Sequence, residues 1–174
     1  MFDFIKIVLY RERTCFLAVN FLIMNIEIVE IEAHQTYPLR HALLRKGMPL
    51  SSCHLEGDNT SETLHLGAFE SENLVGILSA YLNPCPEHRN LRGVQLRAMA
   101  VATAYQRKGI ASQLIQSVFK RIEEHLNPDC IWLNARIAAY ALYESNGFVP
   151  IGTTFEIEPI GTHQRFIKIL SHES

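Results

Sequence analysis

A short basic turn with one glycine holds the residues of this sequence that are best suited to bind an anion. The turn consists of Gln106, Arg107, Lys108 and Gly109, between an apolar run and an amphipathic segment that starts near Ile110. Backbone N–H groups at a helix start point toward an anion, and the helix dipole favours its charge. Gly109 allows close approach because it has no Cβ. This arrangement predicts a site for a phosphate-bearing ligand.

A second block, downstream of this turn, carries polar and aromatic residues at the end of a strand and along a helix. It contains Asn134-Ala135-Arg136 and then Tyr143-Glu144-Ser145-Asn146-Gly147-Phe148. The spacing between the two blocks leaves room for one helix and one strand. Taken together and in this order, they resemble two motifs of the GCN5-related N-acetyltransferase (GNAT) superfamily, over roughly residues 25 to 170. These are the Arg/Gln-x-x-Gly-x-Gly/Ala turn, which wraps the pyrophosphate of coenzyme A, and a later Tyr-Glu-x-x-Gly-Phe motif.

The resemblance implies an N-acetyltransferase that moves the acetyl group of acetyl-CoA to a primary amine, by direct attack in a ternary complex. Acetyl-CoA would be a co-substrate, and no metal would be needed. The pantetheine arm would lie beside Met99, Ala100 and Val101 like an added strand, with a main-chain N–H polarising the thioester carbonyl. The pyrophosphate would contact the residues of the first motif: Gln106, Arg107, Lys108, Gly109, Ile110 and Ala111.

Tyr143 occupies the place of the family's general acid, so it is expected to protonate the leaving thiolate and to contact the cofactor. Tyr140, one helical turn earlier, could line the same cleft. The family pattern commonly has an asparagine seven residues before the tyrosine, where this chain has Arg136. Asn134 lies nine residues before it, so Asn134 is the expected contact to coenzyme A in its place.

The general base and the acceptor are left open by the sequence. Candidate bases are Glu156, Glu158, His65 and His163, and His163 is the first choice because its segment lies near the family's usual substrate side. Residues 48–61 and 153–163 are expected to shape the acceptor cleft. There a carboxylate could hold a cationic amine, and the candidates are Asp58, Glu62 and Glu156. A small-molecule amine, a peptide N-terminus, a lysine, a polyamine, an amino acid and an antibiotic amine all stay open.

Two other functions are weighed against the enzyme. A non-catalytic acyl-CoA sensor on the same fold is the first alternative, because fold does not fix function; Tyr143 in its motif favours the enzyme. An unrelated nucleotide-binding protein is disfavoured because the sequence has neither G-x-G-x-x-G nor G-x-x-x-x-G-K-[ST]. Without the second block, Arg107 and Lys108 would equally suit a solvated basic turn.

The length and composition of the chain also limit its domain organisation and its possible partners. The 174 residues predict one domain, 24–174, preceded by a non-core extension over 1–23. The net charge of −2 does not suggest a nucleic-acid partner, and the apolar run at 16–24 is too short to span a membrane.

Four scattered cysteines without a C-x-x-C pair fit the reducing cytoplasm. Cys85 and His88 lack a matching second pair, so no metal site is expected. A homodimer is plausible.

The apolar spacing predicts the elements that must position these residues. Strands are expected at 26–31, 64–69, 74–82, 94–102, 130–133, 148–157 and 163–170, and helices at 36–46, 110–125 and 137–146. The segments 64–69 and 74–82 should form a hairpin. The fold class is α/β in the layered α+β sense. Its GNAT-like central sheet is mixed and mostly antiparallel, with helices on both faces.

Overall fold

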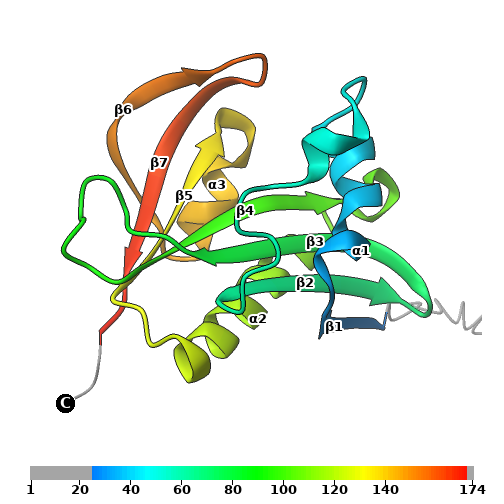
Figure 1. Ribbon diagram of the computed structural model, residues 1–174, viewed down its shortest axis with the longest axis horizontal. Coiled ribbons are helices and arrows are strands. Elements are labelled where there is room, and N and C mark those ends of the chain that lie inside the picture. Colours follow the sequence, from blue (N-terminus) through cyan, green and yellow to red (C-terminus); the bar gives the residue numbers. More distant parts are fainter. Residues whose placement is uncertain (1–24, 172–174) are drawn as a thin grey trace, which may run out of the picture.

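Seven strands form one continuous sheet in the computed structural model, which describes residues 25–171 (Figure 1). The predicted extension, residues 1–23, lies outside the described residues. The strands are β1 Ile26–Glu30, β2 Thr63–Glu70, β3 Asn73–Leu82, β4 Gly93–Val101, β5 Cys130–Arg136, β6 Val149–Ile157 and β7 Gly161–Ile169. The helical segments are α1 Ala33–Leu39, η1 Arg40–Leu44, η2 Leu50–Cys53, η3 Thr103–Tyr105, α2 Ile110–His125, η4 Ile137–Ala139 and α3 Tyr140–Ser145.

The sheet has the order β1-β2-β3-β4-β5-β7-β6, and only its central pair, β4 with β5, is parallel. Each remaining neighbouring pair is antiparallel, including the predicted β2–β3 hairpin. A parallel pair needs a long crossover connection, and α2 supplies it here. The prediction of a mixed, mostly antiparallel sheet is therefore confirmed.

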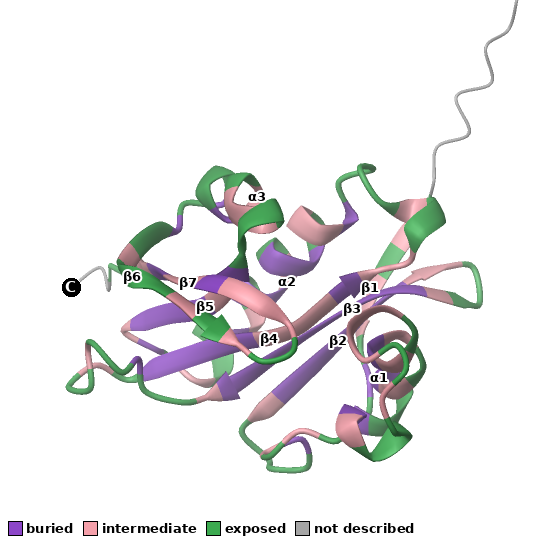
Figure 2. Ribbon diagram, turned by 90° about the horizontal axis from the view of Figure 1, so that it is seen from above, coloured by how far each residue is buried: buried purple, intermediate pink, exposed green. Residues whose placement is uncertain are grey.

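Helices cover both faces of the sheet, as predicted (Figure 2). On one face, α2 buries the stripe Ile110, Leu114, Ile115, Val118, Phe119 and Ile122 in the main core. This spacing of three and four residues keeps the apolar side chains on one side of the helix. On the opposite face, α1 and η1 pack Leu39, Leu43 and Leu44 against Ile31, Ile77 and Ala100. The two cores fix the middle of the sheet from both sides.

The first helix differs from its predicted bounds. It begins three residues earlier, at Ala33, because Glu32 and Gln35 form a capping box in which the Gln35 side chain accepts a bond from the Glu32 N–H at 2.8 Å. Pro38 contributes no N–H to the helix, and beyond it the bonds widen to the π-helical spacing of η1, with Arg45 N–H donating to the Arg40 carbonyl at 2.9 Å. Within residues 25–171 no helix is long and apolar enough to cross a bilayer.

Candidate active site

The parallel contact between β4 and β5, called the seam from here on, consists of three residue pairs. Gly93, Val94 and Gln95 of β4 pair with Cys130, Ile131 and Trp132 of β5, and then the strands separate. A β-bulge on β4 contributes to the separation, because two β4 residues, Ala98 and Met99, oppose Leu78 alone between the flanking pairs. Ala98 takes a positive φ of 52°. The two strands leave each other at the middle of the molecule (Figure 1).

A cavity of about 600 Å³ lies along the seam. Its walls come from both strands and from segments distant in sequence: η1, the loop after it, α3 and the β6–β7 turn. The lining includes Arg40, Arg45, Arg97, Ala98, Met99, Trp132, Asn134, Arg136, Tyr143 and His163. The predicted functional residues Met99, Asn134, Tyr143 and His163 therefore line one cavity, whereas no residue of the basic turn lines it.

The basic turn leads from β4 to the start of α2. Gln106 fixes it by donating from Nε2 to the Val101 carbonyl at 2.9 Å, and Tyr105 donates to Glu70 at 2.5 Å. Arg107 and Gly109 both adopt positive φ, 62° and 81°. A Cβ on Gly109 would meet nothing closer than Gln113 Nε2 at 3.9 Å, so the space beside it is open. The first N–H groups of α2 have no partner within the helix and face this open turn.

The remaining residues of the predicted cofactor set divide between surface and core. Lys108 is exposed and places Nζ 5.1 Å from the centre of the Tyr105 ring. Ile110 is only 1% exposed, and its side chain belongs to the core stripe of α2. On β4, Met99 lines the cavity, whereas the Ala100 side chain is buried in the second core. Any contact that Ile110 or Ala100 makes to a ligand is therefore a main-chain contact.

Tyr143 reaches the cavity from α3 and is 8% exposed. Its ring packs edge-on against Phe148, with centroids 5.8 Å apart. Burial raises the pKa of its hydroxyl well above the ordinary value of about 10, so the hydroxyl stays protonated. Tyr140 was expected to be able to line the same cleft. Instead its ring packs on Phe166 at 5.0 Å, outside the described lining of the cavity.

Comparison with known proteins agrees with this geometry. Residues 50–164 match the family model described as acetyltransferase (GNAT) domain. The chain belongs to the GNAT acetyltransferase family. This acetyltransferase is 28% identical over 145 residues to the uncharacterized N-acetyltransferase YitI of Bacillus subtilis, covering 83% of this chain and 97% of that protein. The predicted family and acyltransferase activity are thereby confirmed.

Solved structures show the same fold at low sequence identity. An aminoglycoside 6'-N-acetyltransferase complexed with coenzyme A superposes with a TM-score of 0.68 at 16% identity, covering 85% of this chain and 99% of that one. Arabidopsis thaliana NAA60, solved with a bisubstrate analogue, gives 0.67 at 15% identity, covering 83% and 98%. The GNAT fold predicted from the sequence is confirmed.

His163 is the one candidate base that lines the cavity in the described part of this acetyltransferase. It is buried on β7 opposite Arg136 of β5, and its Nδ1 lies 2.6 Å from the Gly161 carbonyl. A carbonyl oxygen only accepts, so Nδ1 carries the proton and a neutral ring presents Nε2 as an acceptor. Glu156 is exposed and accepts a bond from Thr162 at 2.5 Å, and Glu158 is exposed as well.

Asn134 also lines the cavity, and its Oδ1 accepts a hydrogen bond from Arg165 Nε at 3.3 Å. Arg165 lies opposite Asn134 in the β5–β7 register and also forms an ion pair with Glu87. The amide nitrogen of Asn134 keeps its donors for other partners. Across residues 25–171, no group of three or more His, Cys, Asp or Glu side chains is arranged to hold a metal ion.

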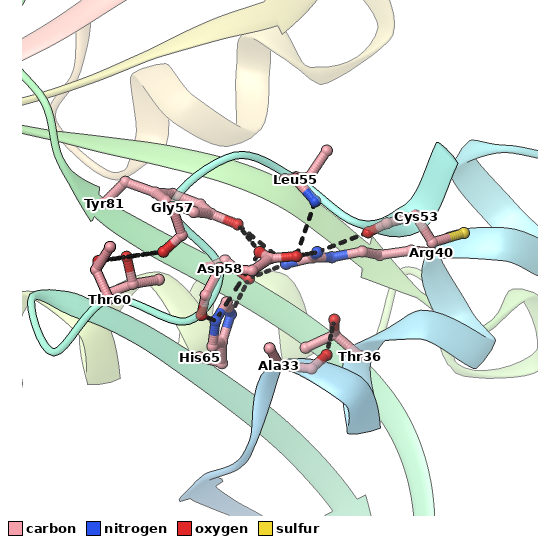
Figure 3. A network of polar contacts seen from close by, with 12 residues as sticks. Ala33, Thr36, Arg40, Cys53, Leu55, Gly57, Asp58, Thr60, His65 and Tyr81 are labelled. Atoms are coloured by element: carbon pink, nitrogen blue, oxygen red, sulfur yellow. Dashed lines mark hydrogen bonds and ion pairs between the residues drawn. The ribbon is translucent and has the colours of Figure 1, made fainter. Parts of the chain in front are cut away.

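A buried polar network ties the loop that follows η1, which lines the cavity, to the sheet (Figure 3). Arg40 of η1 is 1% exposed and donates from Nη1 to Asp58 Oδ2 at 2.7 Å and to the Cys53 carbonyl at 2.9 Å. Its Nη2 donates to Ser79 Oγ at 2.9 Å and to Tyr81 Oη at 3.1 Å. Tyr81 in turn donates to Asp58 Oδ1 at 2.5 Å. The loop after η1 is thus fastened to β3.

His65 closes this network on β2. Its Nε2 lies 2.8 Å from the Asp58 carbonyl and its Nδ1 2.8 Å from Ser79 Oγ, so Nε2 is the donor and Nδ1 accepts from the serine hydroxyl. Burial lowers the pKa of His65 and keeps the ring neutral. Burial alone would raise the pKa of Asp58, but hydrogen bonds from Arg40, Tyr81 and the Leu55 N–H together lower it. His65 and Asp58 are therefore structural.

The sequence marked Arg136 only as a replacement for the family's asparagine, and it did not single out Arg40, Arg45 or Arg97. Arg40 lies between Thr36 and Leu44 at helical spacing, and this position on a buried face was the available signal. Arg97 begins the stretch that leads to the basic turn, yet nothing local marks its role. Conversely, the carboxylates expected to hold a cationic amine are elsewhere: Asp58 binds Arg40, and Glu62 and Glu156 are exposed and outside the described cavity lining.

Proposed function

We propose that this protein transfers the acetyl group of acetyl-CoA to a primary amine by direct attack in a ternary complex. The observation that carries the proposal is the separation of β4 and β5, with the N-terminus of α2 beyond one end and Tyr143 and His163 in the cavity between the strands. An extended ligand placed there would have an anion site at one end and reacting groups at the other.

The cofactor would be held mainly by the main chain. The N–H groups of residues 106–111 would bind the pyrophosphate, with Arg107 and Lys108 adding positive charge. The pantetheine would lie along residues 99–101 of β4, whose edge toward β5 has no described strand partner beyond Gln95. A main-chain N–H of the bulge would polarise the thioester carbonyl and stabilise the oxyanion. The side-chain amide of Asn134 would add a donor from the β5 side.

Two side chains would move protons. His163 Nε2 would accept the proton of the attacking amine, directly or through a water molecule. Tyr143 would donate a hydrogen bond to the sulfur as the C–S bond breaks and would then supply the proton to the departing thiolate. Burial keeps the Tyr143 hydroxyl protonated, so this donor is present at every turnover.

The first experiment is calorimetric titration of acetyl-CoA into the wild type and Gly109→Trp. Micromolar binding that Gly109→Trp abolishes is expected, because the indole would fill the open space of the turn. Gly47→Trp is the matched control, since Gly47 also has a positive φ, 80°, and a Cβ added there would have no atom within 4 Å. The cofactor site would be overturned if both variants lost binding, or if the folded wild type did not bind acetyl-CoA at all.

Turnover is then followed by thiol release with a panel of amines. Acetyl-CoA binding combined with amine-dependent thiol release supports the enzyme. Binding without release for any amine in the panel would favour the acyl-CoA sensor instead. A covalent acetyl-enzyme, detected by mass spectrometry after mixing with acetyl-CoA alone, would contradict direct attack.

A further inference from the structure

The charged residues that line the cavity are all basic. They are Arg40, Arg45, Arg97 and Arg136, together with the titratable His163, and no aspartate or glutamate of the described chain joins them. The whole chain has a net charge of −2, so this lining is opposite in sign to the molecule that surrounds it. A cleft lined by charge of one sign concentrates ligands of the other.

Three of these arginines have no carboxylate partner among the described residues. Arg40 is neutralised by Asp58 at 2.7 Å, whereas no ion pair within residues 25–171 involves Arg45, Arg97 or Arg136. Arg45 donates only to the Leu44 carbonyl, at 3.1 Å, and Arg97 lies over the Tyr81 ring at 5.0 Å. A guanidinium group without a carboxylate partner has N–H donors available to bind an oxyanion in a paired geometry.

The buried network holds one of these groups in place. Tyr81 receives a bond from Arg40, donates to Asp58 and presents its ring to Arg97. Burial is the larger cause and the hydrogen bond to Asp58 the smaller one, and they raise the pKa of Tyr81 to about 12. The phenol beneath Arg97 therefore stays neutral. Arg97 thus packs on the Tyr81 ring, whose hydroxyl is held by hydrogen bonds. Arg97 therefore loses less conformational entropy when it binds a ligand.

The phosphates of coenzyme A are not the obvious partner of these charges. The proposed pyrophosphate site is the turn at residues 106–111, and no residue of that turn lines the cavity. Arg97 lies on the other side of the Ala98 bulge from this turn, and Arg136 lies opposite His163. These positions belong to the part of the cavity where the acceptor must meet the acetyl group.

We infer that the acceptor is an amine that also carries an oxyanion, a carboxylate or a phosphate, and that Arg45, Arg97 and Arg136 receive this group. The inference rests on the proposed function. It excludes polycationic acceptors such as polyamines as the preferred class, since they would meet only like charge. The same positive field disfavours the protonated form of the bound amine and so favours the nucleophile.

The test uses thioether analogues of acetyl-CoA that carry a terminal carboxylate at one to four methylenes from sulfur. Each is compared with its neutral carboxamide, and a parallel phosphonate series distinguishes a phosphate site from a carboxylate site. We expect at least one anionic analogue to bind at least tenfold more tightly than its carboxamide in calorimetry. The probes need no knowledge of the natural acceptor.

Variants connect the preference to the arginines. Arg97→Gln and, independently, the exposed Arg136→Gln should each reduce the anion preference at least fivefold and leave acetyl-CoA affinity unchanged. Arg121→Gln is the control, because it removes the same charge from α2, where Arg121 donates to the Ile28 carbonyl at 3.1 Å outside the cavity.

The outcomes separate the two proposals. If acetyl-CoA itself does not bind, the proposed function fails and this inference fails with it. If acetyl-CoA binds but the carboxamides bind as tightly as both anionic series, the acceptor inference alone is overturned. An anion preference that survives both Arg97→Gln and Arg136→Gln would overturn the assignment of these two arginines, since neither would then supply the charge.

Discussion

Arg40 and Asp58 form an ion pair of 2.7 Å in which both side chains are almost completely enclosed, at 2% and 3% exposure. A buried pair contributes little beyond the cost of desolvating its two charges, but removing one partner leaves the other charge uncompensated. The pair joins η1 to the loop that precedes β2, and this loop forms one wall of the cavity. Its integrity therefore concerns both stability and the shape of the cavity.

Asp58→Asn should destabilise the protein by about 3–5 kcal/mol, because Arg40 would keep its charge in a buried site. Urea denaturation measures the change. Glu87→Gln is the matched control, since it breaks the more exposed pair with Arg165 and should cost less than about 1 kcal/mol. Equal effects of the two substitutions would show that the Arg40 site is hydrated and not a buried charge.

The free energy of unfolding should fall as the pH falls, in two steps. The folded-state pKa of His65 is lowered, so the unfolded state binds more protons below about 6.5 and stability is lost as the pH drops below that value. The pKa of Asp58 is lowered too, so its contribution is present above about 3.8 and is lost as the pH falls further, through its folded-state pKa.

His65→Gln should remove the upper step. Urea midpoints measured from pH 7 to pH 5 would become flatter in this variant than in the wild type, even if its stability at pH 7 is lower. His125→Gln is the control, because His125 is exposed at the end of α2. A slope that His65→Gln leaves intact would assign the upper step to another histidine.

Tyr143→Phe should lower kcat by about 10²-fold or more and leave acetyl-CoA affinity within twofold, because only the proposed proton donor to the leaving sulfur is lost. Steady-state kinetics and calorimetry provide the two values. Tyr140→Phe is the control: the Tyr140 hydroxyl is buried and has no hydrogen-bond partner among the described residues, so its removal should be neutral or stabilising. Equal losses of kcat in both variants would refute the assignment of Tyr143.

Ala98→Val should destabilise the protein by about 1–3 kcal/mol, because a β-branched residue is strained at the positive φ of the bulge. Ala98→Gly should be tolerated, since glycine adopts this conformation freely. If the bulge orients the main chain toward the thioester, Ala98→Val should also weaken acetyl-CoA binding, as measured by titration. A valine variant as stable as the glycine variant would argue against strain at this position.

Local patterns were sufficient for the elements and for part of the site. The stripe of α2 and the alternation of β2 and β3 depend on neighbouring residues, so their positions could be predicted. Tyr143 was predicted through its motif, and the structure places it in the cavity. The bulge at Ala98 could not be predicted, because alanine does not mark a positive φ. The convergence of Arg40, Arg97 and Arg136 could not be predicted either, because it depends on how η1, β4 and β5, which are distant in sequence, lie together in the fold.

The three-pair seam has a thermodynamic consequence. Strands β1–β4 and strands β5–β7 form two antiparallel halves of the sheet, and few main-chain hydrogen bonds join them at β4 and β5. Separation of the two halves should therefore be the large fluctuation of the sheet that costs the least free energy. A cofactor that forms hydrogen bonds to both halves would oppose this separation, and at a concentration of a hundred times its Kd it would add about 2.7 kcal/mol to the free energy of unfolding. Hydrogen exchange at residues 96–101 and 133–136 should then report cofactor occupancy directly, without any acceptor present.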